Sequence, residues 1–396
     1  MMQSKNESPW RSILLLLLSG IACIIFLCTG LVMSIAGLFA VGTGDAETAT
    51  STLMFAGGMV VLGLVLIPSV YYSFMHILDR PARPLPFNRV PTYVLVIAWT
   101  ISAAFTILID SKDSSSFLLI LFNLVTIILP IWILVRIGLR GLDAGSPERQ
   151  WGTFTVGLTI VPFIIGLLEI FLLMAAGIAA FVWVMLNPES LNSLENLSTR
   201  LLYTSNPDTI IKILSPYFFN PAVIILGLMF FSILVPVVEE TIKPLGVWLG
   251  PKRLASPEQG FAIGVLCGAA YALMESLGIM PGLPETSNLL SIVRAGTDLL
   301  HVATTGLMGW ALVSAWRERK FLQLGLIFLL VISLHGLWNA FALFSSTQLA
   351  LANLPNPSQW GQALPVISII GLGILTLSNL FILYSVNHKF NQRDAE

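Results

Sequence analysis

Long, continuously apolar segments alternate with short polar connections along almost the whole chain. A helix that crosses the hydrocarbon core of a bilayer, which is about 30 Å thick, needs roughly 20 apolar residues. Transmembrane β-strands would instead alternate apolar and polar side chains, and these segments do not. Ten segments meet the helical criterion: 13–41, 52–76, 91–111, 116–139, 153–186, 221–248, 260–281, 291–316, 321–346 and 364–387.

The pattern predicts an all-α fold, a polytopic bundle of about ten transmembrane helices. The segment 153–186 is too long for one upright helix, so we expect it to be tilted, or bent near Pro162. The first segment is about twice as long as the apolar region of a signal peptide and predicts a retained signal anchor. Composition agrees, because only 10% of the residues are charged and the mean hydropathy is +0.86, whereas soluble domains carry about 25% charged residues.

Basic residues predict the orientation of the helices. If every segment crosses once, 16 of the 20 basic residues fall on one side: Lys5, Arg11, Arg80, Arg83, Arg89, Arg136, Arg140, Arg149, Lys243, Lys252, Arg253, Arg317, Arg319, Lys320, Lys389 and Arg393. The exceptions are Lys112, Arg200, Lys212 and Arg294. The positive-inside rule then places both termini in the cytoplasm. If the chain comes from a prokaryote, the membrane is the plasma membrane. The net charge of −1 gives no sign of a nucleic-acid partner.

Ionisable side chains divide the chain into regions. The region 1–190 contains five predicted helices that are nearly free of ionisable side chains. The sequence does not indicate a function for this region. The region 191–220 is an exterior connection, followed by the helices of 221–346, which carry the candidate chemistry. The region 347–396 holds the last helix and a cytoplasmic tail.

The exterior connection contains leucines at helical spacing: Leu191, Leu194, Leu197 and Leu201. This spacing predicts a short amphipathic helix on the membrane surface. An ordinary ordered loop is the alternative.

Four consecutive predicted helices carry ionisable or polar side chains far inside their apolar segments. They are Glu239, Glu240 and Lys243; Glu275; Arg294, Asp298 and His301; and His335 with Asn339. At 1.5 Å per residue, Glu239 lies about 15 Å from the cytoplasmic end of its segment, and Glu275, His301 and His335 about 20–23 Å. Charged groups at such depth face the bundle interior or a water-filled cavity. We therefore predict that Glu239, Glu275, His301 and His335 line one polar cavity.

Each motif also has a purely structural interpretation. Glu239, Glu240 and Lys243 would suit a solvated helix end with charge pairs one turn apart. His335 would suit an ordinary hydrogen bond between helices. The convergence of four helices at one depth favours a chemical role.

The order and spacing of these residues resemble the PrsW family of intramembrane proteases, which is grouped with the CAAX prenyl endopeptidases and the Abi proteins. The matching motifs are Glu-Glu-x-x-Lys at 239–243, Tyr-x-x-x-Glu at 271–275, His301, and His-x-x-x-Asn at 335–339, within about 231–345. Tyr271 stands where the family usually has Phe, and Asn339 where PrsW-type sequences often have Asp. The resemblance implies glutamate-based hydrolysis of a membrane-anchored, single-span protein substrate.

Peptide hydrolysis needs a base that activates water and donors directed at the developing oxyanion. Glu239 is the predicted base, and Glu240 or Glu275 would orient it or share its proton. His335 and Asn339 would donate to the oxyanion, with His301 as an auxiliary donor. The supporting residues are Lys243, Asp298 and Arg294.

Three alternatives stay open. We favour a mechanism without a metal cofactor, since the sequence has no HExxH motif; in a zinc site the ligands would be His301, His335, Glu239 and Glu275. A proton-coupled or small-solute transporter would also bury Glu and His residues. Carriers often show internal repeats, and we find none. A scaffold that retains the network for stability is a third interpretation.

Overall fold

A computed structural model describes residues 10–83, 90–108, 117–218, 220–250, 254–279, 287–346 and 359–393. Five of the basic residues used to orient the helices lie outside these ranges: Lys5, Arg89, Lys112, Lys252 and Arg253. Within the described ranges the regular structure is helical and contains no β-strand, which confirms the all-α prediction.

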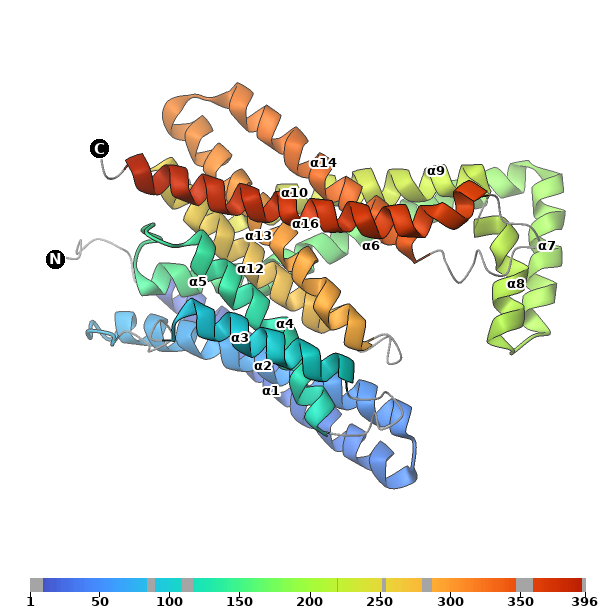
Figure 1. Cartoon of the computed structure of the whole chain (residues 1–396), viewed down its shortest axis with the longest axis horizontal. Coiled ribbons are helices and arrows are strands. Elements are labelled where there is room, and N and C mark those ends of the chain that lie inside the picture. Colours follow the sequence, from blue (N-terminus) through green and yellow to red (C-terminus); the bar gives the residue numbers. More distant parts are fainter. Residues whose placement is uncertain are drawn as a thin grey trace. The chain divides into compact units, whose positions relative to one another are not determined.

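The helices follow one another along the chain as shown in Figure 1. Their bounds are α1 Trp10–Thr43, α2 Ala46–Ile77, α3 Thr92–Leu108, α4 Phe117–Gly138, α5 Pro147–Leu158, α6 Ile160–Leu186, α7 Pro188–Leu202, α8 Pro207–Phe218, α9 Pro221–Met229, the π-helix η3 Phe230–Leu234, α10 Val235–Ile242, α11 Leu245–Trp248, α12 Pro257–Ile279, α13 Ser287–Glu318, α14 Phe321–Ser345 and α16 Gln359–Arg393.

Each of the ten predicted segments is helical over most of its described residues. In the part of the chain that the structure describes, nine helices are long and apolar enough to cross a membrane, and α3 is a shorter apolar helix. This confirms a multi-pass integral membrane protein. The cytoplasmic placement of the termini stays a prediction.

Prolines account for the breaks in two of the long segments. The fifth segment is interrupted at Thr159, between α5 and α6, three residues before Pro162. Pro162 has no N–H for the carbonyl of Leu158, and its ring crowds that carbonyl. In the sixth segment α10 ends at Ile242, and Pro244 precedes the short helix α11.

The polar connection after α6 is folded into α7 and α8. The prediction of a helix over Leu191–Leu201 is confirmed, and the ordered-loop alternative is wrong. The leucines Leu191 and Leu194 are exposed in the structure. Their contact with a membrane surface remains a prediction.

The chain forms two compact units. Unit 1 comprises residues 1–162, 243–327 and 379–396; unit 2 comprises 163–242 and 328–378. The chain therefore passes from unit 2 into unit 1 between Ile242 and Lys243. Each unit contains part of the predicted site.

The pair α12–α13 forms the buried centre of unit 1 (Figure 1). Glycines on α12 let the two backbones approach closely, as small residues do between membrane helices. A methyl group added at Gly264 would collide with the Thr305 carbonyl, and one at Gly268 with the His301 carbonyl. This packing fixes His301 of α13 against the face of α12 that carries Tyr271 and Glu275.

In unit 2, α14 packs against the π-helix η3. A methyl group at Gly336 would collide with the Ser232 carbonyl, so glycine is required for this approach. The contact places His335 and Asn339, which flank Gly336 on α14, next to the chain that runs through η3 into α10.

Candidate active site

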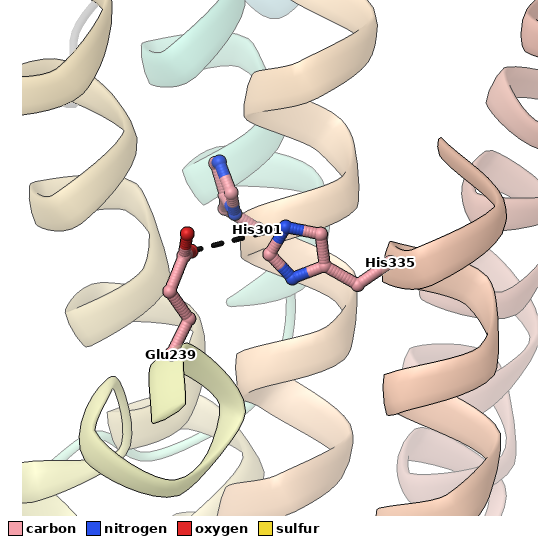
Figure 2. A group of neighbouring side chains, drawn as sticks. All are labelled: Glu239, His301 and His335. Atoms are coloured by element: carbon pink, nitrogen blue, oxygen red, sulfur yellow. Dashed lines mark ion pairs between the residues drawn. The ribbon is translucent and has the colours of Figure 1, made fainter. Parts of the chain in front are cut away.

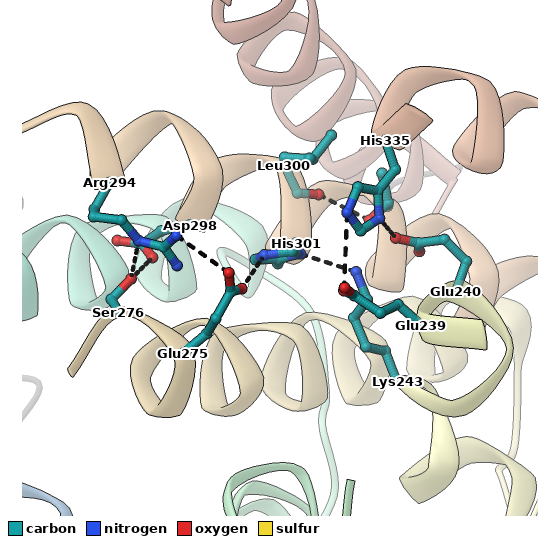
Figure 3. Close-up of polar contacts among 11 residues, drawn as sticks. Glu239, Glu240, Lys243, Glu275, Ser276, Arg294, Asp298, Leu300, His301 and His335 are labelled. Carbon is teal, nitrogen blue, oxygen red and sulfur yellow. Dashed lines mark hydrogen bonds and ion pairs between the residues drawn. The ribbon is translucent and has the colours of Figure 1, made fainter. Parts of the chain in front are cut away.

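A chain of polar contacts runs through unit 1 and ends at Lys243 (Figure 3). The Nζ of Lys243 lies 2.9 Å from Nδ1 of His301, and the Nε2 of His301 lies 2.6 Å from Oε2 of Glu275. Both Lys243 and His301 are buried. The ring of Tyr271 supports both, since Lys243 Nζ is 5.2 Å from its centre and the His301 ring meets it edge-on.

The same chain continues beyond Glu275. Its Oε1 accepts a hydrogen bond of 3.2 Å from Nη1 of Arg294, whose Nε donates to the hydroxyl of Ser276 at 3.0 Å. That hydroxyl in turn donates to Oδ1 of Asp298 at 2.6 Å. Ser276 thus joins Arg294 to Asp298 and holds the guanidinium beside Glu275.

Buried contacts surround the His301 ring on both sides. Lys243 lies at its Nδ1 and Glu275 at its Nε2. The network also contains Arg294, which lies beside both Glu275 and Asp298. A buried network of this kind is stable only when its charges are paired and hydrogen-bonded.

Unit 2 contains a second buried cluster, between α10 and α14. The Nδ1 of His335 lies 2.7 Å from Oε1 of Glu240. Its Nε2 lies 3.8 Å from Oε2 of Glu239, the ion pair drawn in Figure 2. All three side chains are buried. One imidazole is therefore oriented by one carboxylate and directed at another.

Asn339 has a specific partner in unit 2. Its Nδ2 donates to the carbonyl of Phe231 at 2.8 Å. In the π-helical pattern this carbonyl would accept from the N–H five residues on, but residue 236 is a proline and has none. The adjacent π-helical bond, from Val235 N–H to the Phe230 carbonyl, is present. The Asn339 amide thus replaces the donor that Pro236 lacks.

The structure places every predicted site residue in one of the two clusters. Unit 1 brings together five of them: Lys243, Glu275, Arg294, Asp298 and His301. Unit 2 brings together Glu239, Glu240 and His335, with Asn339 one helical turn beyond His335.

Sequence reasoning missed Ser276 and the supporting role of Tyr271. The signal for Ser276 was its place at the end of a row of small residues four apart on α12, which begins at Gly260 and includes Gly264, Gly268 and Ala272. A hydroxyl at the end of such a row, beside Glu275, faces the neighbouring helix and can bond to it.

Comparison with known proteins gives one family. The model described as PrsW family intramembrane metalloprotease matches residues 152–372, which is more than half of the chain. No curated protein and no solved structure matches the chain. The matched range includes α6 to α14 and thus both clusters.

Proposed function

This chain belongs to the PrsW family and is an intramembrane protease, and we propose that it hydrolyses peptide bonds of membrane-anchored proteins with water activated by Glu239. The observation that supports this best is the pair of buried glutamates around His335. One glutamate orients the imidazole, and the other faces its second nitrogen. A carboxylate and an imidazole are thus held near each other, and both are buried.

In the proposed reaction Glu239 takes a proton from a water molecule, whose oxygen attacks the scissile carbonyl. The oxyanion that forms accepts a hydrogen bond from Nε2–H of His335. Glu240, at Nδ1 of the same ring, holds the imidazole in place. Glu239 then passes its proton to the leaving amine, so that the C–N bond breaks and the carboxylate is restored.

The unit 1 cluster supports the same reaction through Lys243. Glu275 and Arg294 fix the His301 ring, and His301 fixes the lysine ammonium. We propose that Lys243, held in this way, contributes positive charge to the reaction. It follows Glu239 by four residues in the sequence.

The family description names a metal, and the donor chemistry of this chain fits one. Glu239 and His335 of unit 2 and His301 of unit 1 are a carboxylate and two imidazoles, residue types that bind zinc. Each imidazole has one nitrogen on a glutamate, as is usual for metal-binding histidines. A bound zinc ion would polarise the scissile carbonyl and acidify its water.

One contact nevertheless favours the metal-free mechanism. The nitrogen of His301 that does not face Glu275 lies 2.9 Å from the ammonium of Lys243. A second cation at this nitrogen would be strongly repelled at low dielectric. We therefore propose that Lys243 provides the positive charge and that His301 positions it.

Chelation separates the two mechanisms. We expect EDTA or 1,10-phenanthroline to leave cleavage in detergent at its initial rate, because no step of the proposed reaction uses a metal. The measurement is the cleavage rate before and after chelation, with the zinc content of the purified protein determined in parallel. Stoichiometric zinc, with activity lost on chelation and restored by zinc, would replace the proposed mechanism and leave the protease function standing.

Asn339 supports η3 in this proposal and does not contact the substrate. Asn339→Ala should leave the Phe231 carbonyl without its donor and destabilise the protein by about 1–3 kcal/mol, with reduced cleavage. Thermal unfolding in detergent and the cleavage rate measure the two effects.

The second variant Pro236→Ala provides the decisive control. It restores a backbone N–H at residue 236, so the double variant Asn339→Ala/Pro236→Ala should regain most of the lost stability and activity. If Asn339 donates directly to the oxyanion, the restored N–H cannot replace it. Recovery of stability without recovery of cleavage would therefore show a direct catalytic role.

The experiment that tests the function is co-expression with membrane-anchored candidate substrates, single-span proteins first. Wild-type protein should release a shorter product that the Glu239→Gln variant does not. A product whose ends lie within a transmembrane or juxtamembrane segment supports the proposal. Proton-driven solute uptake by reconstituted vesicles, with no cleavage of any candidate, would support the transporter alternative instead.

A further inference from the structure

A separate cavity of about 480 Å³ lies in unit 1, between the first turns of α1 and α5 and the region of α11. No residue of the two polar clusters lines it. Arg11 and Arg149 line it at the helix ends that the basic residues place on the cytoplasmic side. Trp10, a residue type common at membrane interfaces, lies beside the Arg11 guanidinium at 5.4 Å.

Beyond the arginines the walls are apolar. On α1 the wall continues along Leu14, Leu15 and Leu18. On the opposite side it runs from Arg149 to Ile160, eleven residues or about 16 Å along a helix. That length is about half of the 30 Å hydrocarbon core, which is one leaflet. The cavity therefore has a charged end at the interface and an apolar wall of leaflet depth.

The charged end of the cavity, formed by Arg11, Glu148 and Arg149, is net positive. Glu148 also lines the cavity, and its Oε2 lies 3.3 Å from Nδ1 of His76. The same nitrogen lies 2.7 Å from the hydroxyl of Ser12. Two guanidiniums, those of Arg11 and Arg149, against the one carboxylate of Glu148 make this end of the cavity net positive. Guanidinium groups bind phosphate through paired hydrogen bonds.

We propose that this cavity binds one anionic phospholipid of the cytoplasmic leaflet. Its phosphate contacts Arg11 and Arg149, and an acyl chain lies along the leucines of α1. The cavity is also bordered by Gly246 and Leu249, in the segment that directly follows Lys243. A bound lipid therefore contacts the part of the chain that leads away from the His301 cluster.

The test is a binding measurement on the purified full-length protein in a neutral detergent. Native mass spectrometry would compare dioleoyl phosphatidylglycerol with phosphatidylethanolamine and phosphatidylcholine of the same chains, and add inorganic phosphate as a competitor. Phosphatidylglycerol should bind at least about tenfold more tightly than either zwitterionic lipid. Millimolar phosphate should not displace it, because phosphate lacks the acyl chain.

Variants separate this site from general lipid contact. Arg11→Gln/Arg149→Gln should lose the preference, whereas Arg317→Gln/Arg319→Gln, which changes two exposed arginines on the same predicted side, should keep it. Val156→Phe, which fills the apolar part, should weaken binding without changing charge. If the arginine variant does not fold, the binding of phosphatidylglycerol to Val156→Phe tests the proposal on its own.

Three results would overturn the proposal: equal binding of the three lipids, an unchanged preference in both cavity variants, or displacement by inorganic phosphate. The last result would reassign the cavity to small anions. A preference for phosphatidylethanolamine would reassign it to a zwitterionic headgroup, with the ammonium at Glu148.

Discussion

Glu239→Gln is expected to reduce cleavage at least about 10²–10⁴-fold, the contribution typical of a positioned general base. The amide keeps the shape of the side chain but cannot take a proton from water. The buried pair of Glu240 and His335 does not depend on this carboxylate, so expression and thermal unfolding should stay near wild type. The measurement is the initial cleavage rate of a membrane-anchored substrate at equal amounts of folded protein.

Glu318→Gln is the matched control. Glu318 is also a glutamate near a basic residue, since its Oε2 lies 2.7 Å from Nζ of Lys320, but this pair is exposed at the end of α13. Its cleavage rate should equal that of the wild type. If Glu239→Gln retained near wild-type activity, the base would have to be Glu240 or Glu275, and the corresponding glutamine variants would identify it.

Arg294→Met should destabilise the protein by about 3–5 kcal/mol, the cost typical of removing one partner from a buried ion pair. Arg294 is buried and bonds to Glu275 and Ser276, so its removal leaves the carboxylates of Glu275 and Asp298 without a neighbouring guanidinium. Cleavage should fall as well, because Glu275 then no longer fixes the His301 ring. Unfolding in a denaturing detergent measures the loss.

A double variant tests whether charge balance is the cause. Arg294→Met/Glu275→Gln removes one cation and one anion together, and it should be more stable than Arg294→Met alone. Arg317→Met, which changes an exposed arginine, should alter stability by no more than about 0.5 kcal/mol. If Arg294→Met retained full stability, the network would not contribute to folding in the way proposed.

The sequence predicted the helices well because hydrophobic length is a local property. Each of the ten apolar segments is helical over most of its described residues, and the break before Pro162 follows from the missing N–H of proline alone. The depth of a side chain in the membrane also follows from the number of residues between it and the end of its helix, at 1.5 Å per residue. This is why the residues later found in the two clusters could be selected before any contact was known.

The partners of those residues could not be predicted in the same way. Helical spacing cannot tell that Glu240, and not Glu239, bonds to Nδ1 of His335, because both glutamates lie on one turn. From the sequence we predicted that Asn339 donates a hydrogen bond to the oxyanion. In the structure its amide donates to the carbonyl of Phe231. Finding that bond requires knowing which helix packs on η3, and this depends on contacts between distant segments.

The bond between Asn339 and Phe231 also has a consequence for biosynthesis. Its two ends are 108 residues apart, and Glu240 and His335 are 95 apart. At about 5–20 residues per second, α10 is made roughly 5 to 20 seconds before α14 supplies these partners. Until α14 enters the membrane, Glu239 and Glu240 do not have His335 beside them. In the proposed mechanism the chain would therefore become active only after α14 has been inserted.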